Sequence, residues 1–169
     1  MMAGGSFFEQ VADHPKIFVV VENVRSLFNV GAIFRSADGA GASGVILTGF
    51  TGTPPRREIS RVALGAEESI PWVAYPTTEE AILDLRHHGI SVIALESTDE
   101  SIDYLEAPVT FPAAIVVGHE VEGVMPATLE ACDYAIHLPM HGKKISLNVS
   151  VAAGIALYGL RNASSIRSD

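Results

Sequence analysis

The sequence predicts an α/β domain built on a largely parallel sheet. Short and almost continuous apolar runs alternate with longer segments that carry apolar residues at helical spacing. Continuous apolar runs are typical of strands that helices cover on both faces. The chain has 169 residues, of which 48% are hydrophobic, and this length and composition fit one folded domain.

Six runs rich in β-branched residues, each bounded by glycine, proline or polar residues, are predicted to be strands. The run at 69–74 is the least regular of them, and the strand there is expected to be short. In chain order they are Ile17–Val21, Gly44–Thr48, Ser69–Ala74, Ser91–Leu95, Ala114–Gly118 and Tyr134–Leu138.

Five segments between these runs have the spacing of helices. They are Val30–Asp38, Glu58–Leu64, Thr78–His87, Ala127–Ala131 and Val149–Asn162. Asn29 is the expected N-cap of the first helix, and Thr77-Thr78-Glu79-Glu80 is a good start for the third. The last helix is apolar on nearly every side and rich in small residues, which predicts burial in the core or at a subunit interface.

Charge is distributed unevenly along the chain. The net charge is −9, which by itself argues against a nucleic-acid partner. However, residues 74–142 hold 12 acids and one base, whereas residues 143–169 hold 4 bases and 1 acid. If the two ends of the chain meet in space, they would form a basic face on an acidic body. The bases concerned are Arg25, Arg35, Arg56, Arg57, Arg61, Lys143 and Lys144.

The sequence gives no sign of a membrane or secreted protein. No apolar run approaches the roughly 18 residues of a membrane span. The first residues lack the basic and apolar regions of a signal peptide. Cys132 is the only cysteine, so no internal disulfide forms, and we expect a cytoplasmic protein.

The segment from Leu138 to Asn148 is predicted to be a ligand-binding loop. A strand ends at a proline, and a polar stretch with a glycine, two lysines and a serine leads to Asn148 at the N-cap position of the last helix. Loops held in this way surround small ligands with backbone N–H and C=O groups. His119-Glu120 begins like a zinc-protease motif, but position 123 is glycine, so no zinc site is predicted.

Three segments together resemble the SpoU (TrmH-like) branch of the SPOUT RNA methyltransferases. Asn23–Gly41 resembles the first motif of that family, with Asn29-Val-Gly31 leading to Arg35. Ile115–Val124 resembles the second, with Gly118-His-Glu120 and Gly123. Leu138–Ala152 resembles the third almost residue for residue. One departure is His119, where many relatives carry asparagine.

The resemblance implies a SPOUT-type fold with a C-terminal trefoil knot, in which helices cover both faces of the sheet. Knots are rare in proteins, so this expectation depends on the resemblance alone. It also implies a homodimer and a single methyltransferase domain over residues 1–169. In this domain, residues 1–15 form an N-terminal segment and the motifs span 23–160.

The activity that the resemblance implies is the transfer of a methyl group from S-adenosylmethionine to a ribose 2′-hydroxyl of tRNA or rRNA. A sulfonium is already a good electrophile, so no metal is required. The protein must hold the donor, hold the ribose and help the hydroxyl lose its proton.

The resemblance assigns three sets of residues. The donor site comprises Leu95, Glu96, Gly118, Leu138, Met140, Ser146 and Leu147. The catalytic set comprises Arg35, Asn29, Glu120, Ser146 and Asn148, in which Arg35 orients the hydroxyl and its phosphate. The RNA-binding set comprises Arg25, Arg56, Arg57, Arg61, Lys143 and Lys144.

Two alternatives stay open at this point. His119 and the net acidity are compatible with an RNA-binding pseudoenzyme that keeps the fold without the chemistry. The acidity is also compatible with a methyltransferase for a small molecule.

Overall fold

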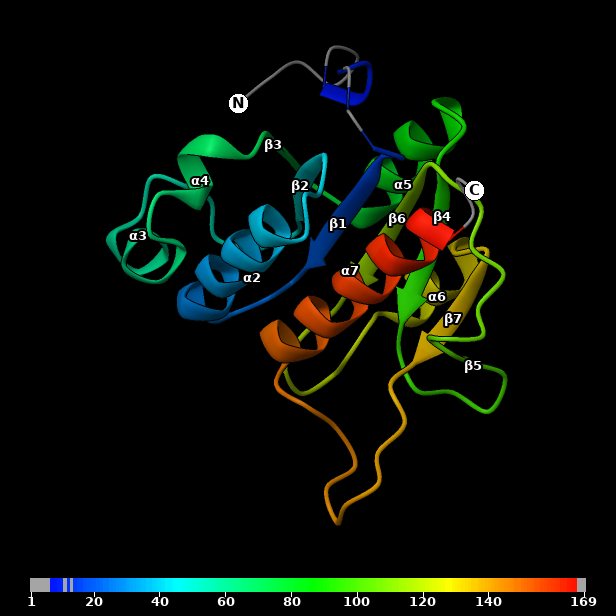
Figure 1. Cartoon of the computed structure of the whole chain (residues 1–169). Coiled ribbons are helices and arrows are strands. Elements are labelled where there is room, and N and C mark those ends of the chain that lie inside the picture. The colour runs from blue at the N-terminus through cyan, green and yellow to red at the C-terminus, as the bar shows by residue number, and fades with distance from the viewer. Residues whose placement is uncertain (1–6, 11, 13, 167–169) are drawn as a thin grey trace.

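The computed structural model describes residues 7–10, 12 and 14–166, and its described strands form one parallel sheet (Figure 1). The strand order is β3-β2-β1-β6-β4-β7-β5, and every neighbouring pair is parallel. The strands are β1 Ile17–Glu22, β2 Gly44–Thr48, β3 Trp72–Tyr75, β4 Ser91–Leu95, β5 Ile102–Asp103, β6 Ala113–Val117 and β7 Tyr134–His137. The predicted parallel α/β class is therefore confirmed.

Helices cover both faces of the sheet because successive strand residues point to opposite sides. In β1, Val19 and Val21 pack into a cluster with residues of α2 and α7, whereas Phe18 and Val20 join a second cluster with residues of α5. Figure 1 shows α2 and α7 side by side on one face. The helices are α2 Leu27–Gly39, α3 Arg57–Ala63, α4 Ala66–Ser69, α5 Thr78–His87, α6 Pro126–Ala131 and α7 Val149–Ile166.

Two short elements were not expected, and one expected strand is displaced. The strand predicted at Ser69–Ala74 is wrong at its start, because Ser69 ends the short helix α4 and the strand begins at Trp72. Leu64 and Gly65 both have left-handed backbones, with φ of 53° and 92°, and this turn separates α3 from α4. Elements as short as α4 and β5 have no periodicity that a sequence pattern can reveal.

The start of α2 corrects the predicted cap. Ser26, not Asn29, is the N-cap, and its hydroxyl accepts a hydrogen bond from the Asn29 N–H at 3.3 Å. The Asn29 side chain is therefore free of the capping role. At α5 the predicted cap is confirmed, since the Thr77 hydroxyl accepts from the Glu80 N–H.

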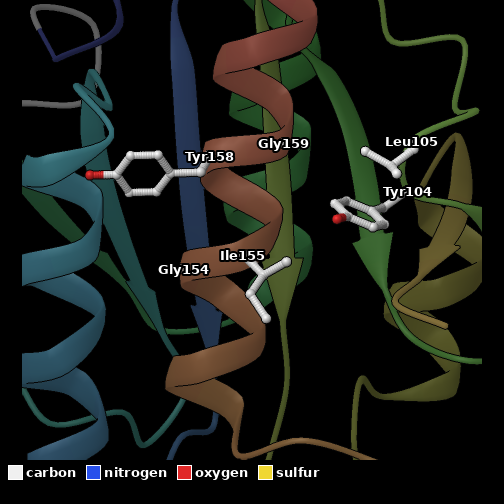
Figure 2. A pocket seen from close by; sticks show the side chains of 6 residues that line it. All are labelled: Tyr104, Leu105, Gly154, Ile155, Tyr158 and Gly159. Carbon is white, nitrogen blue, oxygen red and sulfur yellow. The ribbon is translucent and has the colours of Figure 1, made fainter. Parts of the chain in front are cut away.

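Helix α7 extends to Ile166, one turn beyond its predicted end at Asn162, and only one of its faces is covered. Ala153, Ala156 and Leu157 are buried against the sheet. Burial in the core or at a subunit interface was expected, and in the single chain Val151 and Tyr158 are half exposed. Figure 2 shows the open face, a shallow apolar pocket of about 410 Å³ between α7 and the segment after β5.

The structure also bears on Cys132 and on membrane-spanning helices, and it leaves the knot and the N-terminal segment untested. Cys132 is packed as predicted, and burial, with neighbouring carboxylates, raises the pKa of its thiol to about 12. No helix in the described ranges has the length and hydropathy to cross a membrane. The trefoil knot stays a prediction, and most of the N-terminal segment predicted for residues 1–15 lies outside the described residues.

Candidate functional site

The candidate site lies at the carboxyl edge of the sheet, where the strand order changes direction. From β1 the chain builds outward to β2 and β3, and it then crosses to β4 on the other side of β6. Ligands of open parallel sheets bind outside the carboxyl ends of the strands at such a point. The three motif segments all leave strands at this edge: the first follows β1, the second follows β6, and the third follows β7.

Hydrogen bonds join these segments through one carboxylate. The Glu120 oxygens accept from the backbone N–H groups of Arg25 at 3.0 Å and Ser26 at 2.9 Å. The Asn29 side-chain amide also donates to Glu120, at 3.1 Å, so two residues of the predicted catalytic set are in contact. The Asn148 amide in turn donates to Asn29 Oδ1 at 3.2 Å. Residues from all three motifs therefore form one chain of hydrogen bonds, which we call the Asn29–Glu120–Asn148 relay.

The orientation of each amide in the relay is fixed by its other partner. Asn148 is the N-cap of α7, as predicted, and its Oδ1 accepts from the N–H groups of Ser150 and Val151 at 2.9 and 3.4 Å. Because this oxygen is occupied, the amide nitrogen is left to donate to Asn29. Asn29 then donates its own N–H to Glu120, so donors and acceptors alternate along the relay.

The surroundings of Glu120 favour its ionised form. Partial burial alone raises the pKa of a carboxyl, but the N–H groups of Ser26 and Arg25 and the Asn29 amide bond to the carboxylate and hold the pKa below its ordinary value. Glu120 is therefore charged at neutral pH. It is an acceptor and an anchor, not a group poised to exchange a proton.

Because the folded state lowers the pKa of Glu120, its contribution to stability is present above the ordinary carboxyl pKa and is lost as pH falls through the folded value. We therefore expect the stability difference between the wild type and Glu120→Gln to be constant from pH 7 to about 5 and to shrink only at lower pH. Urea unfolding of both proteins across this range measures it. A difference that already falls between pH 7 and 6 would contradict the assignment.

A cleft of about 820 Å³ opens beside the relay, over the ends of β4, β6 and β7. Residues predicted to hold the donor line it, together with Lys143 and Lys144. These donor residues are Leu95, Glu96, Gly118, Leu138, Met140, Ser146 and Leu147. Apolar side chains beside backbone polar groups suit a flat heteroaromatic ring such as adenine.

The floor of the cleft depends on two glycines in the turn after β6. A Cβ at Gly118 would lie 2.3 Å from the Gly123 carbonyl carbon. Gly123 has φ of 70°, and a Cβ there would lie 2.1 Å from Glu96 Oε2. Only glycine allows this close approach. Glu96 in turn accepts from the Val124 N–H at 2.9 Å, so its carboxylate holds the turn in place.

Sequence reasoning missed one side chain that supports the site, Glu22, and did not predict the hydrogen bonds of His119. Glu22, at the end of β1, is buried and accepts from the Met125 N–H at 2.9 Å and from the Thr128 hydroxyl. The sequence signal that could have revealed Glu22 is an acidic residue at the end of an otherwise apolar strand. His119 Nδ1 accepts from the N–H groups of Val121 and Glu122, so its ring proton belongs on Nε2.

Arg35 is not brought to the cleft. It is exposed, and within the described part of the chain it forms no hydrogen bond or ion pair. Six residues separate it from Asn29 on α2, which places it about 9 Å further along the helix and roughly a third of a turn around it. Ser146, in contrast, lines the cleft from the exposed segment between β7 and α7.

The predicted basic residues are exposed and lie on segments around the site. Arg25 directly precedes the cap of α2, and its N–H bonds to Glu120. Helix α3 packs against α2 at Gly31, which brings its arginines to the first half of α2. The exposed bases are Arg25, Arg56, Arg57, Arg61, Lys143 and Lys144.

Residues 16–158 match the SpoU rRNA Methylase family. The chain is 34% identical, over 168 residues, to the 23S rRNA (guanosine-2'-O-)-methyltransferase RlmB of Pseudomonas syringae pv. tomato, and the match covers 97% of the chain and 67% of that protein. It is 35% identical to the RlmB of Vibrio parahaemolyticus, where the match covers 84% of the chain and 57% of that protein.

The fold is also similar to that of a solved rRNA methyltransferase. The crystal structure of an AdoMet-bound rRNA methyltransferase from Sinorhizobium meliloti superposes with a TM-score of 0.84 at 30% identity, and covers 93% of this chain and 60% of that one. The chain thus spans between about half and two thirds of the length of these three proteins. The matched region includes all three motifs and the relay. The chain belongs to the SpoU rRNA methylase family.

Proposed function

We propose that the chain transfers a methyl group from S-adenosylmethionine to a ribose 2′-hydroxyl of RNA, with rRNA as the first substrate to test and tRNA as the second. The observation that carries the proposal is the Asn29–Glu120–Asn148 relay beside a cleft lined by all seven residues expected at the donor site. Support for rRNA comes from the similarity to the 23S rRNA methyltransferase of Pseudomonas and the rRNA methyltransferase of Sinorhizobium. The relatives are bacterial proteins named for rRNA, and bacterial rRNA lies in the cytoplasm, so we propose that location.

The residues of the cleft fit the donor. Leu95, Leu138 and Met140 supply an apolar slot for the adenine, and the close Gly118–Gly123 turn presents backbone groups beside it. When bound, S-adenosylmethionine supplies an activated methyl group. Ser146, on the wall of the cleft, carries a hydroxyl that can bond to the ribose.

The relay positions these groups rather than reacting. Glu120 is anchored by two backbone N–H groups, so it fixes the start of α2 relative to the turn after β6. Asn29 and Asn148 extend this anchorage to the head of α7, where the segment that carries Ser146 ends. A rigid arrangement of this kind holds reactants at attack distance.

Two measurements test the proposal. Calorimetry measures donor binding, and transfer of a labelled methyl group is measured with rRNA and tRNA transcripts and without RNA. We expect donor binding and labelling of RNA at the 2′-hydroxyl, with RNA affinity falling steeply as salt rises. RNA binding without transfer would favour the pseudoenzyme that His119 and the net charge of −9 also allow. Transfer without RNA would favour a small-molecule substrate.

We also propose that the single domain forms a homodimer through the open face of α7. Figure 2 shows Tyr158 pointing toward α2 and Ile155 on the side of α7 that faces Tyr104. The apolar surface of this face comes from the exposed Ile155 and Tyr158, because the space beside each glycine is already occupied within the chain. A two-fold interface presents the same patch twice, so this apolar face can bury itself.

Replacing Ile155 with aspartate is expected to convert the dimer to a monomer. Ile155 lies in the centre of the open face, and two-fold symmetry would bury two unpaired carboxylates. We expect the dimer to weaken by about a hundredfold or more. Light scattering after gel filtration measures this, with unchanged circular dichroism. Leu83→Asp on α5, an equally drastic change at a 68% exposed position, is the control that should stay dimeric.

A further inference from the structure

We propose that Phe50 is a stacking platform for an unpaired RNA base beside the relay, with His119 supporting the edge of its ring. This inference rests on the proposed function, because it assigns to that site the surface that receives the base. Reaction at a ribose hydroxyl requires a nucleotide that is accessible from outside a helix, and exposed aromatic rings receive such bases.

Phe50 is displayed to solvent by a rigid turn. Its side chain is 63% exposed. Its N–H donates to Asn23 Oδ1 at 3.2 Å, and the Thr51 N–H donates to the Thr48 carbonyl at 3.3 Å. The turn is therefore fixed on both sides of the ring. A large apolar side chain held out in this way has no role in the hydrophobic clusters of the fold.

The backbone around Phe50 is specialised for this geometry. Asn23 and Gly49 both have left-handed conformations, with φ of 51° and 63°. A Cβ at Gly49 would lie 1.9 Å from Asn23 Oδ1, so only glycine fits. The left-handed conformation costs free energy at Asn23, which is not a glycine, and such strain concentrates at functional sites.

The same short segment ties Phe50 to the relay. The Val24 N–H donates to the buried Thr51 hydroxyl at 3.0 Å, on the side of the Phe50 turn. The next two N–H groups, of Arg25 and Ser26, donate to Glu120. Residues 23–26 therefore hold the Phe50 turn and the Glu120 carboxylate in one rigid unit.

His119 lies between the Phe50 ring and the cleft, because it contacts the ring and lines the cleft. The Phe50 and His119 rings lie 6.1 Å apart at 78°, an edge-to-face contact that covers the edge of one ring. His119 lines the cleft, and its Nδ1 is held by two backbone N–H groups. The ring of Phe50 thus has a fixed neighbour on the side of the cleft and an exposed surface elsewhere.

The charges near Phe50 suit the backbone of a nucleotide. Arg25 is exposed two residues from Asn23, and Arg56 and Arg57 follow the loop that begins at Phe50. A stacking ring flanked by cations is the combination that binds single-stranded nucleic acid. It favours RNA over an apolar protein segment, which would not need the arginines.

Variants of Phe50 separate stacking from simple burial. Phe50→Tyr keeps the ring, Phe50→Leu keeps most of the apolar area without the ring, and Phe50→Ala removes both. We expect the alanine and leucine variants to raise the KM for rRNA by about 5- to 100-fold, with the KM of the tyrosine variant within about twofold of the wild type. The affinity for S-adenosylmethionine and the urea midpoint should stay unchanged, because the ring is exposed. Leu83→Ala, at a similarly exposed position on α5, is the control.

A binding assay on the full chain needs no turnover. Fluorescein-labelled oligoadenylate and oligouridylate of about 12 nucleotides are the probes. Because purines stack better, the wild type should bind oligoadenylate more tightly, and the alanine and leucine variants should lose this preference. A wild type that binds these probes but transfers no methyl group would overturn the proposed function and leave this inference standing. Unchanged KM and unchanged base preference in Phe50→Ala, or full activity in Phe50→Leu, would overturn the inference.

Discussion

Glu120→Gln is expected to lower the rate of methyl transfer by about a hundredfold or more. The carboxylate accepts from two backbone N–H groups and from Asn29, and a glutamine amide presents a donor where one of these acceptors is needed. The start of α2 then shifts relative to the turn after β6. Misplacement of reacting groups by about 1 Å is enough to cost a hundredfold in rate. Single-turnover transfer of a labelled methyl group to RNA measures the effect.

The control for this variant is Glu122→Gln. Glu122 lies two residues away and is also exposed, and its side chain forms no hydrogen bond with the residues of the relay, so the same loss of charge should leave the rate within about twofold. A second control is donor binding, which should weaken less than the rate falls. If Glu120→Gln transfers methyl groups at the wild-type rate, the relay has no positioning role.

The fold was predictable because its strands and longer helices leave strong periodic signals. The other five apolar runs, apart from 69–74, are all strands, since a parallel sheet covered on both faces needs apolar residues at every position. The Thr77 cap of α5 and the Asn148 cap of α7 were also predictable, because capping depends on residues within one turn. The displaced start of β3 shows the limit of prediction from periodicity. The left-handed turn at Leu64–Gly65 leads into α4, a helix too short to leave a periodic signal in the sequence.

The site was predictable in its members and not in its connections. Asn29 and Glu120 are 91 residues apart, and Asn29 and Asn148 are 119 apart, so no local pattern can show that they touch. The resemblance supplied the residues, and the strand order supplied the reason they meet. Asn29 was misread as a cap because asparagine favours that position, and Ser26 holds it instead. Both alternatives stayed open for α7, because composition does not distinguish burial in a core from burial in an interface.

Arg35→Ala is expected to lower the rate of methyl transfer by about a hundred- to a thousandfold while the protein stays intact. The side chain is exposed and forms no hydrogen bond or ion pair with the described residues, so the free energy of unfolding should change by less than about 0.5 kcal/mol. Arg35 lies outside the cleft, so donor affinity should also be unchanged. The expected loss is that of one hydrogen-bond donor to the charge that develops in the reaction. Quench measurements of single turnovers at saturating RNA isolate this step from binding.

Arg61→Ala provides the contrast, because Arg61 is also an exposed arginine and lies on the neighbouring helix α3. A residue that only contacts phosphate should raise the KM for RNA and reduce the salt slope of binding by about one, with the rate at saturation unchanged. Arg35→Lys keeps the charge without the planar fork, so it should recover RNA affinity but not the rate if bidentate contact is what matters. An Arg35→Ala protein with a wild-type rate at saturating RNA would remove Arg35 from the reaction and reduce it to the role of Arg61. A loss of rate confined to Arg35 would instead establish that the residue the structure leaves outside the cleft acts on the substrate rather than on the donor.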